Sequence, residues 1–276
     1  MVKLLSTVSS LALAGAVALM STAALADGGP GGGKMRVAAP YSWTGFYGGV
    51  NVGAAWVDDG PVTAAPADAA TTAFFALCVA ANGCPFNIGG DTQTGVIGGI
   101  QLGYNLQMQS FLAGIEVDFQ GTTANASRSN WNGLVVPAGN NGTFSTNASL
   151  AHLGTVRARL GVLVSPTLLA YVTGGLAFGE IQRSYGISFA GAPVFVAGRS
   201  RSTDTGWTAG AGLEWALGNR VTLGAEYLYV DLDGGDSFAA TMVNGANLCT
   251  AANCNFGVRA SDLETHIARV KVNFKF

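Results

Sequence analysis

The chain has 276 residues, of which 49% are hydrophobic and only 11% are charged, and its formal net charge is −2. Soluble domains usually carry about 25% charged residues, so this composition argues against an ordinary soluble protein, and the near-neutral charge argues against a nucleic-acid partner. After residue 26, no apolar run approaches the roughly 20 residues of a membrane-spanning helix, which leaves a closed β-barrel as the structure that can satisfy every backbone polar group in lipid.

The first 26 residues predict a secretory signal peptide. They contain a basic residue at Lys3, an apolar run through Met20, and a small-residue cleavage site at Ala24-Leu25-Ala26. A retained membrane helix is the alternative, but the run is short and is broken by Ser and Gly. We therefore expect residues 1–26 to be cleaved, residues 27–42 to form a flexible periplasmic leader, and residues 43–276 to form the barrel.

Eight stretches of the remaining chain alternate between apolar and polar side chains, which is typical of strands with one apolar and one polar face. In the first stretch, for example, Phe46 and Val50 share the apolar face, whereas Tyr47 and Asn51 share the polar one. In the fourth stretch, the alternation predicts Leu150 on the apolar face. The eight stretches cover approximately residues 44–57, 92–106, 111–120, 150–162, 168–179, 207–215, 221–229 and 264–276.

The connections between these strands alternate in length. Three of them are the short links "QMQS", "SPT" and "GNR", and the other four are long and rich in Asn, Gly, Ala and Thr. Short turns on one rim and long loops on the other are typical of an outer-membrane barrel with periplasmic turns and extracellular loops. The predicted loops are Asp58–Asp91, Gly121–Asn147, Gln182–Asp204 and Asp231–Asp262.

Aromatic residues lie near both ends of the apolar faces, as the interfacial girdles of a membrane barrel require. The predicted periplasmic girdle consists of Phe46, Tyr104, Phe111, Trp215, Phe274 and Phe276, and the predicted outer girdle of Trp56, Phe119, Phe178, Trp207, Tyr227 and Tyr229.

The polar faces carry a balanced set of charges. A soluble, lipocalin-like barrel would expose a polar face made mostly of Gly and Thr, which would be poorly soluble, so we expect the polar face inside. An eight-stranded barrel is only wide enough to be filled by side chains, which favours a salt-bridged, plugged interior over charges that solvate trapped water. The predicted interior network contains the acids Glu116, Asp118, Glu214 and Glu226 and the bases Arg157, Arg159, Arg269 and Lys271.

The four cysteines form two local pairs in the first and last long loops. Cys78 lies near Cys84, and Cys249 lies near Cys254. Because an exported chain passes through an oxidising compartment, two disulfides are predicted. Metal binding is the alternative, but the spacings are poor for zinc and the loops lack histidine.

Three enzyme-like signals have simpler interpretations. His152 and His266 are the only histidines, lie on separate strands and suit the membrane interface because imidazole is amphipathic. The "DLDGGD" segment at Asp231 lacks the ligand spacing of a calcium loop, and "GGPGGG" near residue 30 lacks the ending of a phosphate loop. We therefore predict no catalytic site, no metal site and no cofactor.

Several segments, such as "WTGFYGGVNVGAAW" at Trp43, "TGWTAGAGLEWAL" at Thr205 and the terminal "HIARVKVNFKF", resemble the small outer-membrane β-barrel surface proteins of alphaproteobacteria, in the superfamily of OmpA-like transmembrane barrels. The resemblance covers all eight strands. It implies an eight-stranded antiparallel up-and-down barrel inserted by the outer-membrane assembly machinery, with a C-terminal strand ending in an aromatic residue, here Phe276, as the assembly signal. The long loops share no motif with the family, so the resemblance implies no loop ligand.

These observations predict an integral protein of the cell outer membrane with a structural or surface-interaction role. Its expected partners are outer-membrane lipid and lipopolysaccharide, the assembly machinery, and an extracellular ligand of the loops. A narrow porin for ions or small solutes is the alternative, and a lipid-modifying enzyme lacks a credible site.

Overall fold

A computed structural model describes residues 41–59, 62–66, 69, 72, 76, 87–88, 91–135, 141–189, 192–233, 237–243, 253–260 and 262–276. The predicted signal peptide, most of the predicted leader, and three of the cysteines lie outside the described residues, and the side chain of Cys254 is not described either. Signal-peptide cleavage and the disulfides therefore stay predictions. Within the described ranges, no helix is long and apolar enough to span a membrane.

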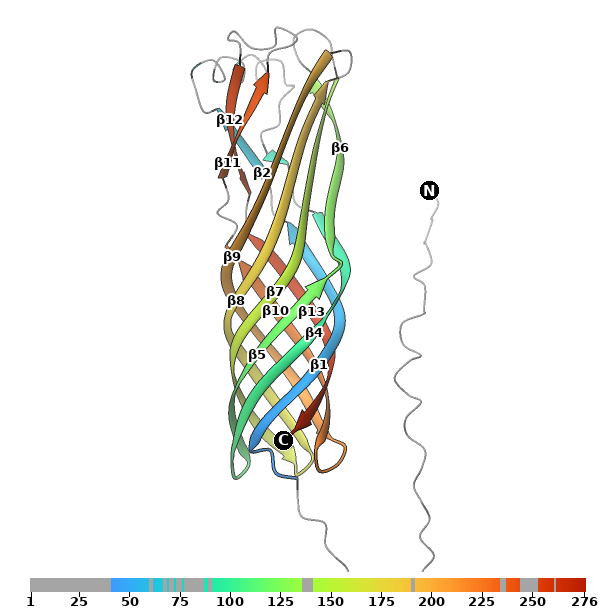
Figure 1. The fold of residues 1–276 in the computed structure, drawn as a ribbon, viewed down its shortest axis with the longest axis vertical. Coiled ribbons are helices and arrows are strands. Elements are labelled where there is room, and N and C mark those ends of the chain that lie inside the picture. The colour runs from blue at the N-terminus through green and yellow to red at the C-terminus, as the bar shows by residue number, and fades with distance from the viewer. Residues whose placement is uncertain are drawn as a thin grey trace, which may run out of the picture. The chain divides into compact units, whose positions relative to one another are not determined.

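Eight antiparallel strands close into a barrel (Figure 1). Each strand pairs with its neighbours in chain order, and pairing between the first and last strands completes the ring. This confirms the predicted eight-stranded up-and-down fold. The strands are β1 (Gly45–Asp59), β4 (Asp91–Met108), β5 (Phe111–Thr122), β7 (Asn141–Ser165), β8 (Leu168–Phe189), β9 (Ala192–Ala216), β10 (Val221–Leu232) and β13 (Leu263–Lys275).

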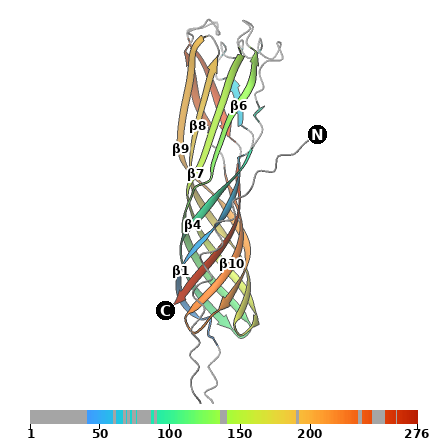
Figure 2. The same ribbon diagram turned by 90° about the vertical axis from the view of Figure 1, so that its right-hand side faces the viewer.

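Beyond the barrel, the strand ladder continues on one side. Strands β7, β8 and β9 extend together past the barrel, and β6 (Asn125–Val135) pairs with the outer part of β7 (Figure 2). Much of the predicted loops Gly121–Asn147 and Gln182–Asp204 is therefore paired strand. A second, four-stranded sheet has the order β11 (Ser237–Val243), β12 (Asn253–Ala260), β2 (Val62–Pro66) and β3 (Asn87–Ile88).

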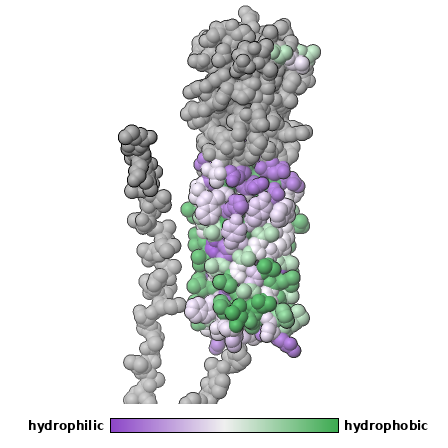
Figure 3. Space-filling view, turned by 180° about the vertical axis from the view of Figure 1, so that it is seen from behind, coloured by the Kyte–Doolittle hydropathy of each residue, from purple (hydrophilic) through white to green (hydrophobic). Residues whose placement is uncertain are grey.

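The apolar faces of the barrel strands point outward and the polar faces point inward. On β4, for example, Ile100 is 63% exposed, whereas its neighbour Gln101 is 4% exposed. Hydrophobic residues gather around the lower part of the barrel in Figure 3, below a zone of hydrophilic residues. Because lipid covers such an apolar surface, the orientation is that of a membrane barrel and not of a soluble one.

Leu150 is an exception to the predicted facing. The pairing of β7 with β8 shifts by one residue between Leu150 and His152, which is a β-bulge. A one-residue shift moves a side chain to the other face of a strand, and Leu150 is therefore inside the barrel and 2% exposed. The prediction that Leu150 shares the outer face with Val156 was wrong.

Candidate functional site: the barrel lumen

The eight charged residues predicted inside the barrel lie on five of its strands. Glu116 on β5 is directly opposite Arg157 on β7, and Glu226 on β10 is directly opposite Arg269 on β13. Because side chains on a strand alternate with a period of two, Asp118 lies on the same inner face as Glu116. The register of neighbouring strands thus brings acids and bases to the same level of the lumen.

Arg157 and Arg159 together contact all four acids. One nitrogen of Arg157, Nη2, lies 2.6 Å from Glu116 Oε1 and 2.7 Å from Asp118 Oδ2. Arg159 places Nη1 at 3.3 Å from Glu116 Oε2 and Nη2 at 2.6 Å from Glu214 Oε2. Arg157 Nη1 also lies 3.4 Å from Glu226 Oε2, and the two guanidinium groups therefore bridge carboxylates from β5, β9 and β10.

Two bases of β13 complete the network. Arg269 Nη2 lies 2.5 Å from Glu226 Oε2 and 3.1 Å from Asp118 Oδ2. Lys271 Nζ lies 3.1 Å from both Glu226 Oε1 and Glu116 Oε2. All eight predicted residues are thus joined in one continuous set of ion pairs, and their side chains are between 0% and 3% exposed.

Two tyrosines that were predicted on the inner face, but not as members of the network, bind to it. The Tyr47 hydroxyl donates to Glu116 Oε2 at 2.7 Å, and the Tyr171 hydroxyl donates to Glu226 Oε1 at 2.8 Å. The Arg159 guanidinium carbon lies 4.0 Å from the centroid of the Tyr171 ring, which is a cation–π contact. An aromatic residue on the polar face of a strand was the sequence signal for this role.

A set of buried apolar side chains fills the lumen toward the extracellular end. We call it the outer apolar layer. Alternation placed positions such as Ile97, Leu228 and Ile267 on the inner face but did not indicate that this part of the inner face is apolar. It placed Leu150 on the outer face, and Ala124 and Leu232 lay in predicted loops. The layer consists of Ala55, Val57, Ile97, Ala124, Leu150, Leu153, Ala177, Ile181, Leu228, Val230, Leu232, Leu263 and Ile267.

A second apolar cluster closes the periplasmic mouth. Trp43, which precedes β1, is only 2% exposed and packs with Leu112, Leu169, Tyr171 and Ala216. The indole Nε1 donates to the carbonyl oxygen of Pro166 at 3.3 Å, and the backbone nitrogen of Trp43 donates to Gln107 Oε1 at 3.0 Å. We call this cluster the periplasmic seal; the sequence reading placed Trp43 at the start of the barrel and assigned it no role.

The two histidines lie on the outer surface of the barrel. The ring of His152 on β7 stacks on Phe119 with centroids 5.5 Å apart, and His266 Nδ1 lies 2.6 Å from the Tyr227 hydroxyl on β10. Three strands separate β7 from β13 in either direction around the ring. The structure thus keeps the histidines far apart among girdle aromatics, and no cluster of metal-binding side chains occurs in the described part of the chain.

A closed antiparallel barrel with an apolar outer belt and a packed, polar interior defines an outer-membrane β-barrel protein. The chain belongs to the outer membrane protein beta-barrel domain family, whose profile matches residues 9–276. This confirms the resemblance found in the sequence.

Two relatives also support this assignment. The 31 kDa outer-membrane immunogenic protein of Brucella melitensis biotype 1 is 32% identical over 274 residues, which cover 97% of this chain and 99% of that protein. The 22 kDa outer membrane protein of Rhizobium leguminosarum bv. viciae is 30% identical over 151 residues, which cover 54% of this chain and 59% of that one. Both are named as outer membrane proteins, and the outer membrane is the location of this protein.

Among solved structures, the outer membrane protein OprG from Pseudomonas aeruginosa is similar to this chain. The match has a TM-score of 0.44 and 12% sequence identity, and it covers 86% of this chain and 99% of that one. At this level of likeness, nothing about activity transfers from OprG to this protein.

Proposed function

We propose that this protein is a non-conducting outer-membrane scaffold, and that it presents extracellular β-structure for contact with partners outside the cell while it contributes to envelope integrity. The observation that carries the proposal is the filled lumen. Four acids are paired with four bases in its middle, and apolar layers lie toward both of its ends.

This arrangement disfavours the alternative of a narrow porin. A permeant ion would have to cross the outer apolar layer, break a network of buried ion pairs, and pass Trp43 at the periplasmic mouth. Each step is costly, because unpaired charge in an apolar environment is strongly unfavourable. The buried charges are engaged in ion pairs with one another, and the two histidines are on opposite sides of the outer surface, so we propose no enzymatic role.

The extended strands support a role in surface contact. Strands β7, β8 and β9 continue well past the barrel wall, and a second sheet is formed by segments of the first and last predicted loops. The name of the Brucella relative records that it is immunogenic, which is consistent with exposure of such structure at a cell surface. We further propose lipopolysaccharide as the lipid around the outer girdle and the outer-membrane assembly machinery as the partner that reads Phe276.

Planar-bilayer recording tests the closed lumen. We expect the unmodified protein to show no discrete channel openings, because the outer apolar layer and the periplasmic seal lie toward the two ends of the lumen. Stable single-channel currents from the unmodified protein would overturn the scaffold proposal and favour the porin.

Shortening the β8–β9 hairpin tests surface presentation. Ser184 pairs with Arg199, so residues 185–198 can be replaced by a two-residue Asn-Gly turn that suits a hairpin. The barrel should still fold, as measured by its heat-modifiable migration, whereas sera raised against the folded protein should bind intact cells less. Unchanged serum binding by the shortened protein would contradict the proposed presentation.

A further inference from the structure

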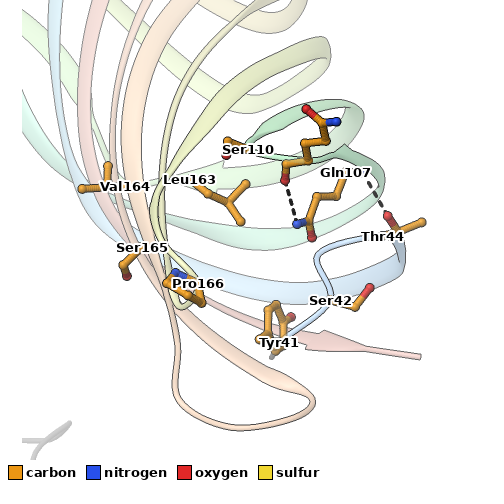
Figure 4. A pocket seen from close by; sticks show the side chains of 10 residues that line it. Tyr41, Ser42, Thr44, Gln107, Ser110, Leu163, Val164, Ser165 and Pro166 are labelled. Carbon is orange, nitrogen blue, oxygen red and sulfur yellow. Dashed lines mark hydrogen bonds between the residues drawn. The ribbon is translucent and has the colours of Figure 1, made fainter. Parts of the chain in front are cut away.

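An open pocket with a volume of about 630 Å³ lies at the periplasmic rim, outside the lumen (Figure 4). Three segments form it: the residues just before β1, the β4–β5 turn and the β7–β8 turn. This volume lies within the range of about 300–1,000 Å³ that is typical of small-molecule sites. The pocket does not belong to the proposed surface role, because it is at the opposite end of the barrel from the extended strands.

One side of the pocket presents exposed hydroxyl and amide groups. The side chains of Ser42, Gln109 and Ser110 line the pocket and have no hydrogen-bond partner among the described residues. Tyr41 lies beside them, and burial, with a smaller contribution from Glu214, raises the pKa of Tyr41 to about 12. The Tyr41 hydroxyl therefore stays protonated at neutral pH and is able both to donate and to accept a hydrogen bond.

The opposite side of the pocket is mostly apolar. Figure 4 shows Leu163, Val164 and Pro166 there, across from Gln107 and Ser110. Gln107 is held in place, because its Oε1 accepts from Trp43 N at 3.0 Å and its Nε2 donates to the carbonyl oxygen of Gln109 at 3.0 Å. The pocket is therefore amphipathic, and Gln107 connects it to Trp43 of the periplasmic seal.

None of the described residues that line the pocket is charged. Lys275 is the cation near Tyr41, with Nζ 5.5 Å from the centroid of that ring, and it donates to the carbonyl oxygen of Ser42. An ammonium group in the pocket would find no counter-charge in the lining, and Lys275, the cation at the edge of the pocket, already donates to Ser42. Hydroxyl and amide groups of a ligand match the lining, because they donate and accept as the lining groups do.

We propose that this pocket binds an uncharged glycan built from N-acetylated amino sugars, with the sugar hydroxyl groups against Ser42, Gln109 and Ser110 and the acetyl methyl group against Leu163 and Pro166. The periplasmic rim faces the compartment in which such a ligand would have to be present. The assignment does not depend on whether the lumen conducts or on what the extracellular sheets contact.

Saturation-transfer NMR titrations on the full-length protein folded in detergent micelles test this site. The probe is the β-1,4-linked tetramer of N-acetylglucosamine, and cellotetraose, which has the same linkage without acetamido groups, is the comparison ligand. We expect the N-acetylated tetramer to bind more tightly than cellotetraose. Equal binding of the two would overturn the role of the apolar side, and absence of binding by both would overturn the site.

Two variants and a matched control locate the binding. Ser42→Ala removes one free hydroxyl group, and Gln109→Gly removes the free amide while suiting the left-handed backbone of this residue, whose φ is 57°. Each should weaken binding by about fivefold, the size expected for one lost hydrogen bond. Asn219→Ala, in the β9–β10 turn outside the pocket, should leave binding unchanged. Equal affinity in all four proteins, or a loss only in Asn219→Ala, would place the glycan elsewhere and contradict the proposal.

Discussion

At the scale of single residues, two glycines make room for the tyrosines of the lumen. Gly103 on β4 is directly opposite Tyr47 on β1, and Gly212 on β9 is directly opposite Tyr171 on β8. A Cβ atom at Gly103 would lie 2.3 Å from the Tyr47 hydroxyl oxygen, and one at Gly212 would lie 2.5 Å from that of Tyr171. Each ring therefore lies across the neighbouring strand at a position where only glycine fits.

We expect Gly103→Ala to destabilise the barrel. The added methyl group would displace the Tyr47 ring and weaken its hydrogen bond to Glu116, which is fully buried. Overpacking of this kind typically costs about 1–3 kcal/mol, so the urea midpoint of the folded protein in micelles should fall. Gly121→Ala is the matched control, because no atom lies within 4 Å of a Cβ there. Equal midpoints for the two variants would mean that Tyr47 is free to move without cost.

At the scale of strands, the sequence predicted the membrane-spanning parts well and the parts beyond the membrane poorly. Alternation is visible where lipid covers one face of a strand, as in β5, because that face must be apolar. In the outer part of β8, Ile181, Tyr185 and Ile187 still alternate with polar residues and glycine, but this stretch lies beyond the aromatic residues of the predicted outer girdle, and the predicted strands ended there. The sequence therefore predicted a loop at Gln182–Asp204, where the structure has a paired ladder.

A similar argument explains the wrong facing of Leu150. The prediction assumed unbroken alternation from Leu150 to Val162, and no Gly or Pro in that part of β7 marks the bulge between Leu150 and His152. The inner face of β7 is apolar at this level, because Leu150 and Leu153 both belong to the outer apolar layer. Hydrophobic pattern alone therefore could not decide which face Leu150 occupies.

Hydrogen exchange distinguishes a ladder from a loop in this part of the chain. Residues 182–188 of β8 pair in register with residues 195–201 of β9, and amides in such a ladder should exchange slowly because they are hydrogen-bonded. We expect strong protection over 182–188, which pair with both β7 and β9, and protection over 195–201 of the amides that point toward β8. The β4–β5 turn at Gln109 and Ser110 should exchange rapidly and serves as the internal reference. Exchange over 182–188 as fast as in that turn would favour the loop predicted from the sequence.

At the scale of the whole molecule, the ion-pair network of the lumen could be predicted from the sequence, whereas the outer apolar layer and the periplasmic seal could not. Alternation placed Glu116 and Arg157 on the inner faces of adjacent strands, so their meeting could be inferred from the sequence, although the long connection between β5 and β7 did not set the exact register. The outer apolar layer depends on which strands bring Leu228, Ile267 and Leu263 to the same level, and the periplasmic seal depends on how the chain enters the barrel at Trp43. Both arise from three-dimensional packing that no local pattern encodes.

Because the ion pairs lie between two apolar clusters, we expect the loss of an ion pair to lower the stability of the barrel without opening its lumen to ions. Among the described residues, Arg159 is the one cation within ion-pair distance of Glu214, and its Nη2 lies 2.6 Å from Glu214 Oε2. Arg159→Ala would leave Glu214 buried with only neutral donors, Thr222 and Asn273. Breaking a buried pair in this way typically costs about 3–5 kcal/mol, whereas Arg201→Ala, whose side chain is 69% exposed beside Glu180, should cost at most about 1 kcal/mol.

The double variant Arg159→Ala/Glu214→Gln should recover much of the stability lost by Arg159→Ala, because no orphan carboxylate remains. Urea titration of the folded proteins measures this order. Neither variant should conduct in planar bilayers, because the outer apolar layer and Trp43 still close the lumen above and below the vacated volume. Channel openings in Arg159→Ala would show that the ion pairs alone keep the barrel closed, and equal stability of the single and double variants would show that Glu214 does not depend on Arg159.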